Sequence, residues 1–309
     1  MFSRLLKRKS GPVVGLEVSE TSISVVVKDE CNGVPTITQV LVINQENTDE
    51  TVEHLKRWIH EKKLTKLPCN IVLSQGDYQM MLVESPEVDA SEMRNAIRWR
   101  LKDLLTIPID QAAIDVFSLP EDGSRSKQKM VYVVAAESTK IRALVELTDT
   151  IGLQLKSIDI SELAIRNIVL SLICDDGGER GIAFARLQRS SGTISIYRQG
   201  NMYLARSFAL DYNAGLFDDL PEEALALELQ RSLDYYERQM GQSPPSVVYI
   251  CGEHINEEKI GDVLKSSVAI PLQILDPGAI AMLSEDVEPR DLSQAMGALG
   301  GAFRMPEAM

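Results

Sequence analysis

The sequence predicts a mixed α/β protein built from two halves of similar layout. Two groups of strand-forming runs support this prediction, at residues 13–18, 23–28 and 35–42, and again at 182–187, 193–198 and 202–209. The connections within each group are short, which favours three consecutive antiparallel strands. In both halves, stretches with helical periodicity then alternate with further strands. A length of 309 residues leaves room for two domains of ordinary size.

The first half continues with alternating helices and strands. Apolar residues recur at helical spacing between residues 49 and 63 and predict the first helix. Asp89-x-x-Glu92 has the pattern of a capping box, which predicts a second helix that ends near Ile107-Pro108. The remaining predicted elements are strands at 70–74, 80–84, 112–117 and 130–136 and helices at 139–151 and 161–173.

The second half follows a polar joint at Asp175-Asp176-Gly177-Gly178 and repeats the same order of elements. A long helix is predicted at about 221–240 because five apolar residues line one stripe: Leu225, Leu229, Leu233, Tyr236 and Met240. Further elements are predicted at 247–251 (strand), 256–267 (helix), 272–275 (strand) and 292–303 (helix). Two α/β halves that each begin with three antiparallel strands are typical of the actin-like fold, a duplicated ribonuclease-H-like unit.

The charge distribution narrows the classes of partner and compartment. A net charge of -13 repels phosphate backbones and argues against nucleic acid. Four cations nevertheless lie in the first nine residues (Arg4, Lys7, Arg8 and Lys9), and no apolar export segment follows them. We expect residues 1–12 to form a basic, flexible segment that either contacts an anionic membrane surface or stays solvated. Four widely spaced cysteines without a Cys-x-x-Cys pair suit a reducing cytoplasm.

Catalytic and metal-binding motifs are mostly missing from the sequence. There is no Gly-Lys dipeptide and no Gly-x-Gly-x-x-Gly, which excludes a Walker A loop and the dinucleotide fingerprint. His54 and His60 are six residues apart on one predicted helix and therefore face different sides of it. His254 follows Cys251 closely, but an ordinary loop histidine is the better interpretation. We predict no metal site.

Six segments resemble, in the same order, those of the PilM family of actin-like type IV pilus assembly proteins. They are Gly15-Leu16-Glu17-Val18, Glu92 to Trp99, Ile107-Pro108-Ile109-Asp110, Val133-Val134-Ala135-Ala136, Glu228 to Tyr236 and Ala298-Leu299-Gly300. The chain looks most similar to the MshI branch, which serves the mannose-sensitive haemagglutinin (MSHA) pilus, and more distantly to the cytoplasmic part of GspL proteins of type II secretion. The resemblance implies a cytoplasmic protein at the inner face of the bacterial inner membrane.

The resemblance also implies where a nucleotide cleft would lie. In actin-like proteins the first hairpin of each half, together with a late glycine turn, wraps nucleotide phosphates. The corresponding residues here are Ser19, Thr21, Ser22, Ser190, Gly192 and Gly252. A serine replaces the usual glycine of the first turn, and Ala185 and Leu187 replace the Asp-x-Gly core of the second. We therefore expect no ATP hydrolysis, although Arg186 or Arg189 offers a positive charge to a phosphate without metal.

The domain organisation follows from the same resemblance. We expect a first half at 13–175 that includes a small inserted subdomain at about 71–136, and a second half at 176–309. ATP-binding relatives have a fourth subdomain before the long helix, but only about eleven residues, 210–220, remain here. That subdomain is therefore reduced or absent.

In PilM proteins, a groove of the first half captures the cytoplasmic tail of a PilN-type inner-membrane protein. Arg94, Arg98 and Trp99 on the capped helix are candidate contacts, unless Trp99 packs in the core and the arginines only solvate the helix. The preferred hypothesis is a non-catalytic adaptor that binds a PilN-like protein, contacts the assembly ATPase, and reaches the membrane through its partner. The alternatives are an ATP-binding switch of the same machinery and an actin-like filament former.

Overall fold

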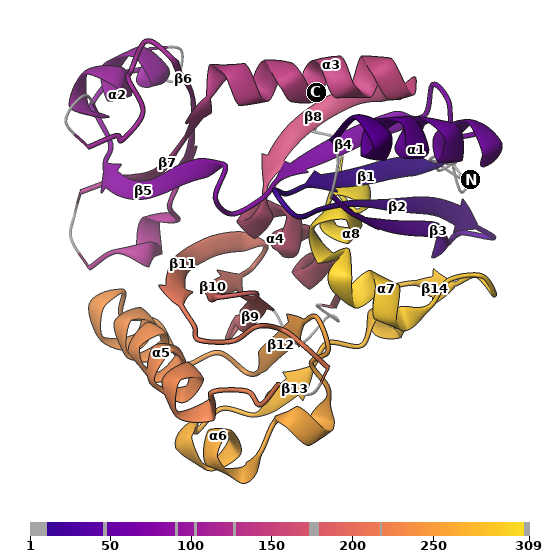
Figure 1. Cartoon of the computed structure of the whole chain (residues 1–309). Coiled ribbons are helices and arrows are strands. Elements are labelled where there is room, and N and C mark those ends of the chain that lie inside the picture. Colours follow the sequence, from indigo (N-terminus) through magenta and orange to yellow (C-terminus); the bar gives the residue numbers. More distant parts are fainter. Residues whose placement is uncertain are drawn as a thin grey trace, which may run out of the picture.

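The computed structural model describes residues 11–45, 48–89, 92–101, 104–125, 128–172, 179–216 and 218–305. The basic start of the chain, up to residue 10, and the predicted joint at 175–178 lie outside this range. Within it, three β-sheets and eight α-helices form two stacked α/β units and a small third sheet (Figure 1).

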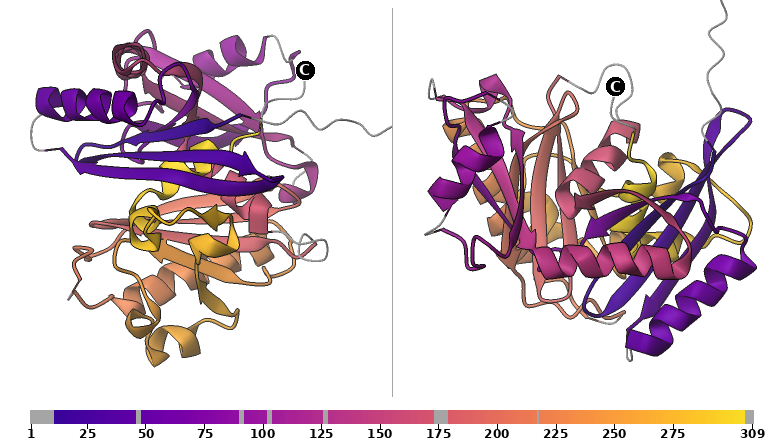
Figure 2. Two further views of the ribbon diagram at one scale, coloured as in Figure 1. Left: turned by 90° about the vertical axis from the view of Figure 1, so that its right-hand side faces the viewer. Right: turned by 90° about the horizontal axis from the view of Figure 1, so that it is seen from above.

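The first sheet has six strands in the order β14-β3-β2-β1-β4-β8. Its strands are β1 (Val13–Val18), β2 (Ser22–Cys31), β3 (Val34–Asn44), β4 (Pro68–Leu73), β8 (Gln154–Ile160) and β14 (Met282–Leu283). The first three are antiparallel, as predicted, while β4 and β8 continue the sheet in parallel with β1. Helices α1 (Thr48–Glu61) and α3 (Ser138–Ile151) cover one face (Figures 1 and 2).

The second sheet repeats this topology with five strands in the order β11-β10-β9-β12-β13. Its strands are β9 (Ile182–Gln188), β10 (Ser191–Arg198), β11 (Asn201–Ala209), β12 (Val248–Gly252) and β13 (Leu272–Ile274). As in the first sheet, three antiparallel strands are followed by two parallel ones on the side of the first strand. The matching strand order in the two sheets is the duplicated unit that the sequence predicted.

Helices α5 (Glu222–Asp234) and α6 (Asp262–Ser267) pack beside the second sheet. The helix predicted at 221–240 continues past α5 as a π-helical turn, Tyr235–Gln239, and all five residues of its predicted stripe are buried. Only residues 210–221 link β11 to α5, and the described part of this link contains no helix or strand.

A small third sheet, β5-β7-β6, projects from the first unit. It contains β5 (Tyr78–Glu84), β6 (Ala112–Ser118) and β7 (Met130–Glu137). Helix α2 (Met93–Leu101) covers its outer face by burying Ile97 and Leu101 against Val131 and Val133. On the inner face, Tyr132 stacks on Phe117 and donates a hydrogen bond to the carbonyl of Tyr203 in β11. The small sheet therefore contacts the second unit as well as the first.

The C-terminal segment returns to the first unit. The single helix predicted at 292–303 is interrupted at Ala295, which separates α7 (Pro289–Gln294) from α8 (Met296–Ala302). Helix α8 packs against β1 at Gly15, where a Cβ atom would lie 1.8 Å from the carbonyl oxygen of Ala298. On its other side α8 meets α4 (Ser161–Leu172), and Asn70 and Asn167 donate side-chain hydrogen bonds to the carbonyls of its last turn. Helices α4 and α8 thus form the core between the two sheets (Figures 1 and 2).

Candidate binding cleft between the two halves

A cleft of about 1070 Å³ lies between the two α/β units. Its walls are the turns that follow β1, β4 and β9, together with parts of β11, β12 and α7. Five of the six residues predicted to face a nucleotide line this cleft: Ser19, Thr21, Ser22, Ser190 and Gly252. The sixth, Gly192, lies at the start of β10 behind Phe208, which is itself a lining residue.

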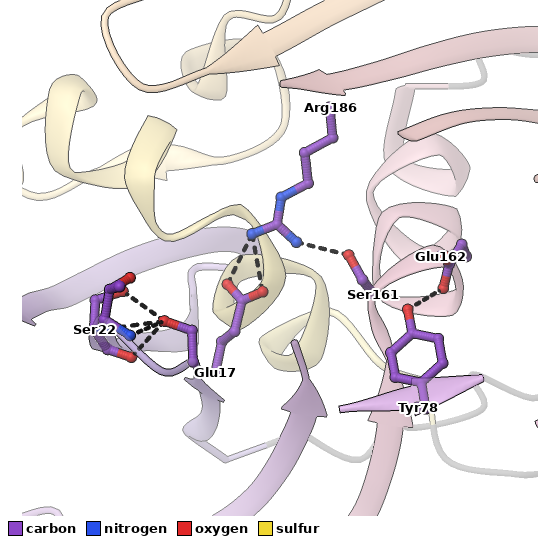
Figure 3. A network of polar contacts seen from close by, with 8 residues as sticks. Glu17, Ser22, Tyr78, Ser161, Glu162 and Arg186 are labelled. Atoms are coloured by element: carbon purple, nitrogen blue, oxygen red, sulfur yellow. Dashed lines mark hydrogen bonds and ion pairs between the residues drawn. The ribbon is translucent and has the colours of Figure 1, made fainter. Parts of the chain in front are cut away.

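The turn after β1 uses its own hydrogen-bonding groups. The hydroxyl oxygen of Ser19 accepts hydrogen bonds from the backbone N–H groups of Ser22 at 2.9 Å and Thr21 at 3.3 Å. The same hydroxyl lies 3.0 Å from the carbonyl oxygen of Ser22, to which it donates (Figure 3). Amide groups at such turns are the ones that bind anions when they are free. Here a serine side chain already accepts from them.

The two predicted glycines both pack closely against other protein atoms. A Cβ atom on Gly192 would lie 2.4 Å from the ring of Phe208. A Cβ atom on Gly252 would lie 2.6 Å from the backbone oxygen of Leu187 in the neighbouring strand. Close approach to protein atoms therefore explains both glycines without any ligand.

A buried ion pair forms the floor of the cleft and joins the two units. Arg186 of β9 donates from Nη2 to both carboxylate oxygens of Glu17 of β1, each at 2.9 Å (Figure 3). Its Nη1 donates to the hydroxyl of Ser161, at the start of α4, at 2.6 Å. The side chains of Arg186 and Glu17 are only 9% and 7% exposed. Burial disfavours the charge of Arg186, but the Glu17 carboxylate outweighs this and raises the pKa of Arg186 above its usual value.

Both charges of the pair have the same place in their strands, because Glu17 is the fifth residue of β1 and Arg186 the fifth of β9. Helix α8 makes room for Glu17 at Gly297, where a Cβ atom would lie 2.4 Å from the Glu17 carboxyl carbon. This pair was not predicted from the sequence. The sequence feature that could have indicated the pair is one charged residue in each of two mostly apolar strands, the acid Glu17 in β1 and the base Arg186 in β9.

A second buried carboxyl lies beside the floor. The Tyr78 hydroxyl of β5 donates a hydrogen bond to the Glu162 carboxylate of α4 (Figure 3). Glu162 is almost fully buried, and this burial raises its pKa. The pKa of Tyr78 is also raised, first by burial and then by the charge of Glu162. This contact connects the small third sheet to the helix between the units.

Two contacts between side chains lie at the rim of the cleft, one neutral and one charged. Gln75, in the turn after β4, donates from Nε2 to the hydroxyl of Ser207 in β11 at 2.5 Å. Two residues later, Asp77 forms an ion pair of 2.9 Å with Lys140 of α3. The rim therefore has a neutral hydrogen bond between the two units and an ion pair within the first unit.

The three candidate partner contacts lie on α2, away from the cleft. Trp99 is 83% exposed, so the alternative that it packs in the core is wrong. Arg94 pairs with Asp115 at 2.9 Å, and Arg98 donates to the backbone oxygen of Ile109 at 2.6 Å. Both arginines thus contact the rest of the small subdomain, Arg94 through an exposed ion pair, and Trp99 is the largely exposed apolar residue of the three.

The described part of the chain lacks two features. None of its helices combines the length and the apolar character that a membrane span requires. It also contains no group of three or more His, Cys, Asp or Glu side chains arranged to hold a metal ion.

The family profile of the type IV pilus assembly protein PilM matches residues 13–213, about two thirds of the chain. The chain belongs to the PilM family. The resemblance predicted from the sequence is thereby confirmed at the level of the family. No curated protein sequence is significantly similar to the chain.

Comparison with solved structures confirms the actin-like fold of this PilM-family chain. It is similar to a chain of the PilM-PilN type IV pilus biogenesis complex, with a TM-score of 0.73 and 16% identity over 96% of this chain and 98% of that one. It is also similar to the cytoplasmic domain of EpsL, an inner-membrane component of the type II secretion system of Vibrio cholerae (TM-score 0.54, 12% identity, 94% and 95% covered). A Bacteroides thetaiotaomicron protein with an actin-like ATPase fold and unknown function gives a TM-score of 0.53 at 13% identity, with 87% and 92% covered.

Proposed function

We propose that this PilM-family protein is a nucleotide-independent adaptor at the cytoplasmic face of a type IV pilus assembly platform. It binds the cytoplasmic tail of a PilN-like inner-membrane protein and reaches the membrane through that partner. Family membership supports the pilus role, and the fold shared with a chain of the PilM-PilN complex supports the partner class. The finer proposal is that the chain serves an MSHA-type pilus as its MshI-like component and also contacts the assembly ATPase.

The Glu17–Arg186 ion pair is the observation that supports nucleotide independence. ATP phosphates are acceptors and need N–H donors, cations or a metal around them. In this cleft Arg186 is neutralised by Glu17, and the N–H groups of Thr21 and Ser22 are bonded to Ser19. Arg189 is the remaining arginine of the lining, but Glu20 and Glu253 outnumber it with negative charge. These residues leave few donors for nucleotide phosphates, so no hydrolysis step is assigned to them.

The proposed domain division is consistent with this function. A first half at 13–175 with its inserted small subdomain at about 71–136 would bind the tail, and a second half at 176–309 would support it. A short link at 210–221 stands where ATP-binding relatives have the fourth subdomain. Without that subdomain, the cleft lacks one of the surfaces that would contact the adenosine of ATP.

We place the tail next to the small subdomain, with Trp99 as its main contact. An 83% exposed tryptophan is unusual on a surface that needs no partner, and tryptophan contributes more binding energy than most residues at interfaces. Arg94 and Arg98 act through their contacts to Asp115 and Ile109, which hold the helix that presents Trp99. Loss of either arginine should therefore weaken tail binding indirectly.

A peptide titration tests the proposal directly. The peptide copies the cytoplasmic tail of the single-span protein encoded beside the gene for this chain. We expect binding with a Kd in the micromolar range and at least tenfold weaker binding by Trp99→Ala. Leu227→Ala serves as the matched control, because Leu227 is also exposed (45%) but lies on α5 of the second unit. No binding at high micromolar peptide, or equal losses in both variants, contradicts the proposed contact.

A thermal shift separates the adaptor from the ATP-binding switch. A ligand that binds only the folded state must raise the melting temperature, and a ligand at 100 times its Kd does so by an amount equivalent to about 2.7 kcal/mol. We expect no shift with millimolar ATP and magnesium. A clear upward shift would favour the switch.

A further inference from the structure

Two buried acceptor atoms without a donor lie close together in sequence at the rim of the cleft. Among the described residues, three buried side-chain polar atoms lack a hydrogen-bond partner, and two of them are Oε1 of Gln75 and Oδ2 of Asp77. Both residues belong to the turn after β4 and line the cleft. Buried polar atoms in folded proteins nearly always have a partner, so two such atoms on one turn require an explanation.

The other polar atoms of both side chains are engaged, which fixes their positions. Nε2 of Gln75 donates to Ser207 of the second unit at 2.5 Å. Oδ1 of Asp77 lies 2.9 Å from the Lys140 ammonium. The side chains are therefore held in place while one oxygen of each remains without a donor.

What these oxygens lack is a hydrogen-bond donor, and a group with several donors and no acceptor can satisfy both. Phosphate or carboxylate groups would bring further acceptors to the same place. A guanidinium group presents five N–H donors in a planar fork and accepts nothing, so it can serve a carboxylate oxygen and an amide oxygen together. We propose that this end of the cleft binds an arginine side chain of an extended peptide segment.

The rest of the cleft suits the peptide that would bear this arginine. Its volume of about 1070 Å³ exceeds the space of one side chain. The lining is rich in hydroxyl and amide groups that can bond a peptide backbone, including Asn44, Ser191 and Ser293. Of the basic residues in the lining, Arg186 is neutralised by Glu17, so a cationic ligand is opposed by Arg189 and, beside Asp77, by Lys140, whose charge Asp77 compensates.

The hydrogen bond between Gln75 and Ser207 closes the site and has to open before a ligand can enter. In this structure it keeps the two units in contact at the rim, and the two unpaired oxygens are shielded from water. Ser207 is exposed, so its hydroxyl can exchange Gln75 for water. The guanidinium then bonds to Gln75 and Asp77 without any change at the Glu17–Arg186 floor. This site is separate from the tail contact at Trp99, so the two tests fail or succeed independently.

A titration of the full chain with an acetylated and amidated tri-arginine peptide tests the site. The matched peptides are tri-lysine and tri-glutamate, and binding is followed by calorimetry and by the amide NMR signals of the protein. We expect saturable tri-arginine binding that shifts the signals of Gly76 and Ser207, tri-lysine binding at least fivefold weaker, and no tri-glutamate binding. Absent tri-arginine binding, or signal shifts confined to other surfaces, overturns the proposal.

Variants exclude unspecific attraction of a cationic peptide to a chain of net charge -13. Asp77→Asn should weaken tri-arginine binding at least tenfold. Glu53→Gln removes the same charge from the far side of the first unit, on α1, and should change the affinity less than twofold. Gln75→Leu, which removes the second acceptor without changing charge, should weaken it at least threefold. Equal losses in Asp77→Asn and Glu53→Gln, or an unchanged affinity in folded Gln75→Leu, contradicts the assignment.

Discussion

The floor and the rim of the cleft both join the two α/β units, but they do so by opposite means. At the floor, Arg186 has Glu17 and Ser161 as partners, and all three side chains are buried. At the rim, a neutral hydrogen bond from Gln75 to exposed Ser207 crosses between the units, next to two oxygens without donors. At the floor, the charged groups have all these partners within the protein. At the rim, the hydrogen bond between Gln75 and Ser207 can be exchanged for another partner.

Under the proposed nucleotide-independent function, the buried floor accounts for how the two halves stay together without a nucleotide. In a nucleotide-binding cleft, the ligand itself supplies charges that both halves contact. Here Glu17 and Arg186 supply them from equivalent positions of the two first strands. A buried pair of this kind contributes little net stability over apolar residues, but the loss of one partner leaves an uncompensated buried charge.

The largest effect is therefore expected from a change of one floor charge. Arg186→Met should lower the free energy of unfolding by about 3–5 kcal/mol, because the Glu17 carboxylate then stays buried without a cation. Urea unfolding followed by circular dichroism measures this loss. The double variant Glu17→Met/Arg186→Met removes both charges and should recover most of the stability. If the double variant is less stable than either single variant, the loss in Arg186→Met does not come from leaving the Glu17 charge without its partner.

A smaller effect is expected from pH, through the carboxyl of Glu162 beside the floor. Burial raises the pKa of Glu162 in the folded state, so the folded protein holds this proton more tightly than the unfolded chain. The contribution of Glu162 to stability should therefore fall as pH rises from about 4.3, the usual glutamate value, to its raised folded pKa, and stay constant above that.

Glu162→Gln removes this dependence while it keeps an acceptor for the Tyr78 hydroxyl. The measured quantity is the difference in unfolding free energy between variant and wild type at several pH values. We expect this difference to change in favour of the variant as pH rises from 4 to 7. The comparison is needed because burial also raises the pKa of Asp159, which adds a slope of the same sign to both proteins. A constant difference contradicts a raised pKa at Glu162.

Much of the fold could be predicted because it depends on local patterns. Alternating spacing of apolar residues predicted the three antiparallel strands of each half, and with them the duplication. Helical spacing predicted the buried stripe that begins in α5. Strand β8 was missed because Leu155 and Ile158 are separated by two polar residues, and a register shift in its pairing with β4 interrupts the alternation there. The return of β14 to β3 is a pairing of distant segments that no local pattern encodes.

The candidate cleft was predicted in position but not in chemistry. Ser19 was expected as a substitute for a phosphate-binding glycine, whereas its hydroxyl fills the turn itself. Arg186 was considered as a phosphate ligand, but a bidentate partner 169 residues away neutralises it. Which charges meet across two domains depends on tertiary packing, and a sequence shows only that each charge lies in an apolar strand.

At the rim, substitution of Gln75 should change stability much less than substitution at the floor. Gln75→Leu removes a neutral hydrogen bond at a partly exposed position, but it also removes an oxygen that has no donor. These two effects oppose each other, so we expect a change within about 1 kcal/mol in the free energy of unfolding. Urea unfolding under the conditions used for Arg186→Met gives the direct comparison. A loss as large as that of Arg186→Met would show that the rim is as essential as the floor.

The smallest effect on stability is expected at Trp99, which belongs to neither connection. Its side chain is 83% exposed, so Trp99→Ala should change the free energy of unfolding by less than about 0.5 kcal/mol. The chain has one other tryptophan, Trp58, which packs against the core of the first unit. In a Trp58→Phe background, the fluorescence of Trp99 should therefore have the emission maximum of tryptophan in water, and it should shift to shorter wavelength when the partner tail binds. A blue-shifted maximum without the tail, or a destabilised Trp99→Ala variant, would mean that Trp99 is already covered by the protein itself. The proposed tail contact would then have to be sought elsewhere on the small subdomain.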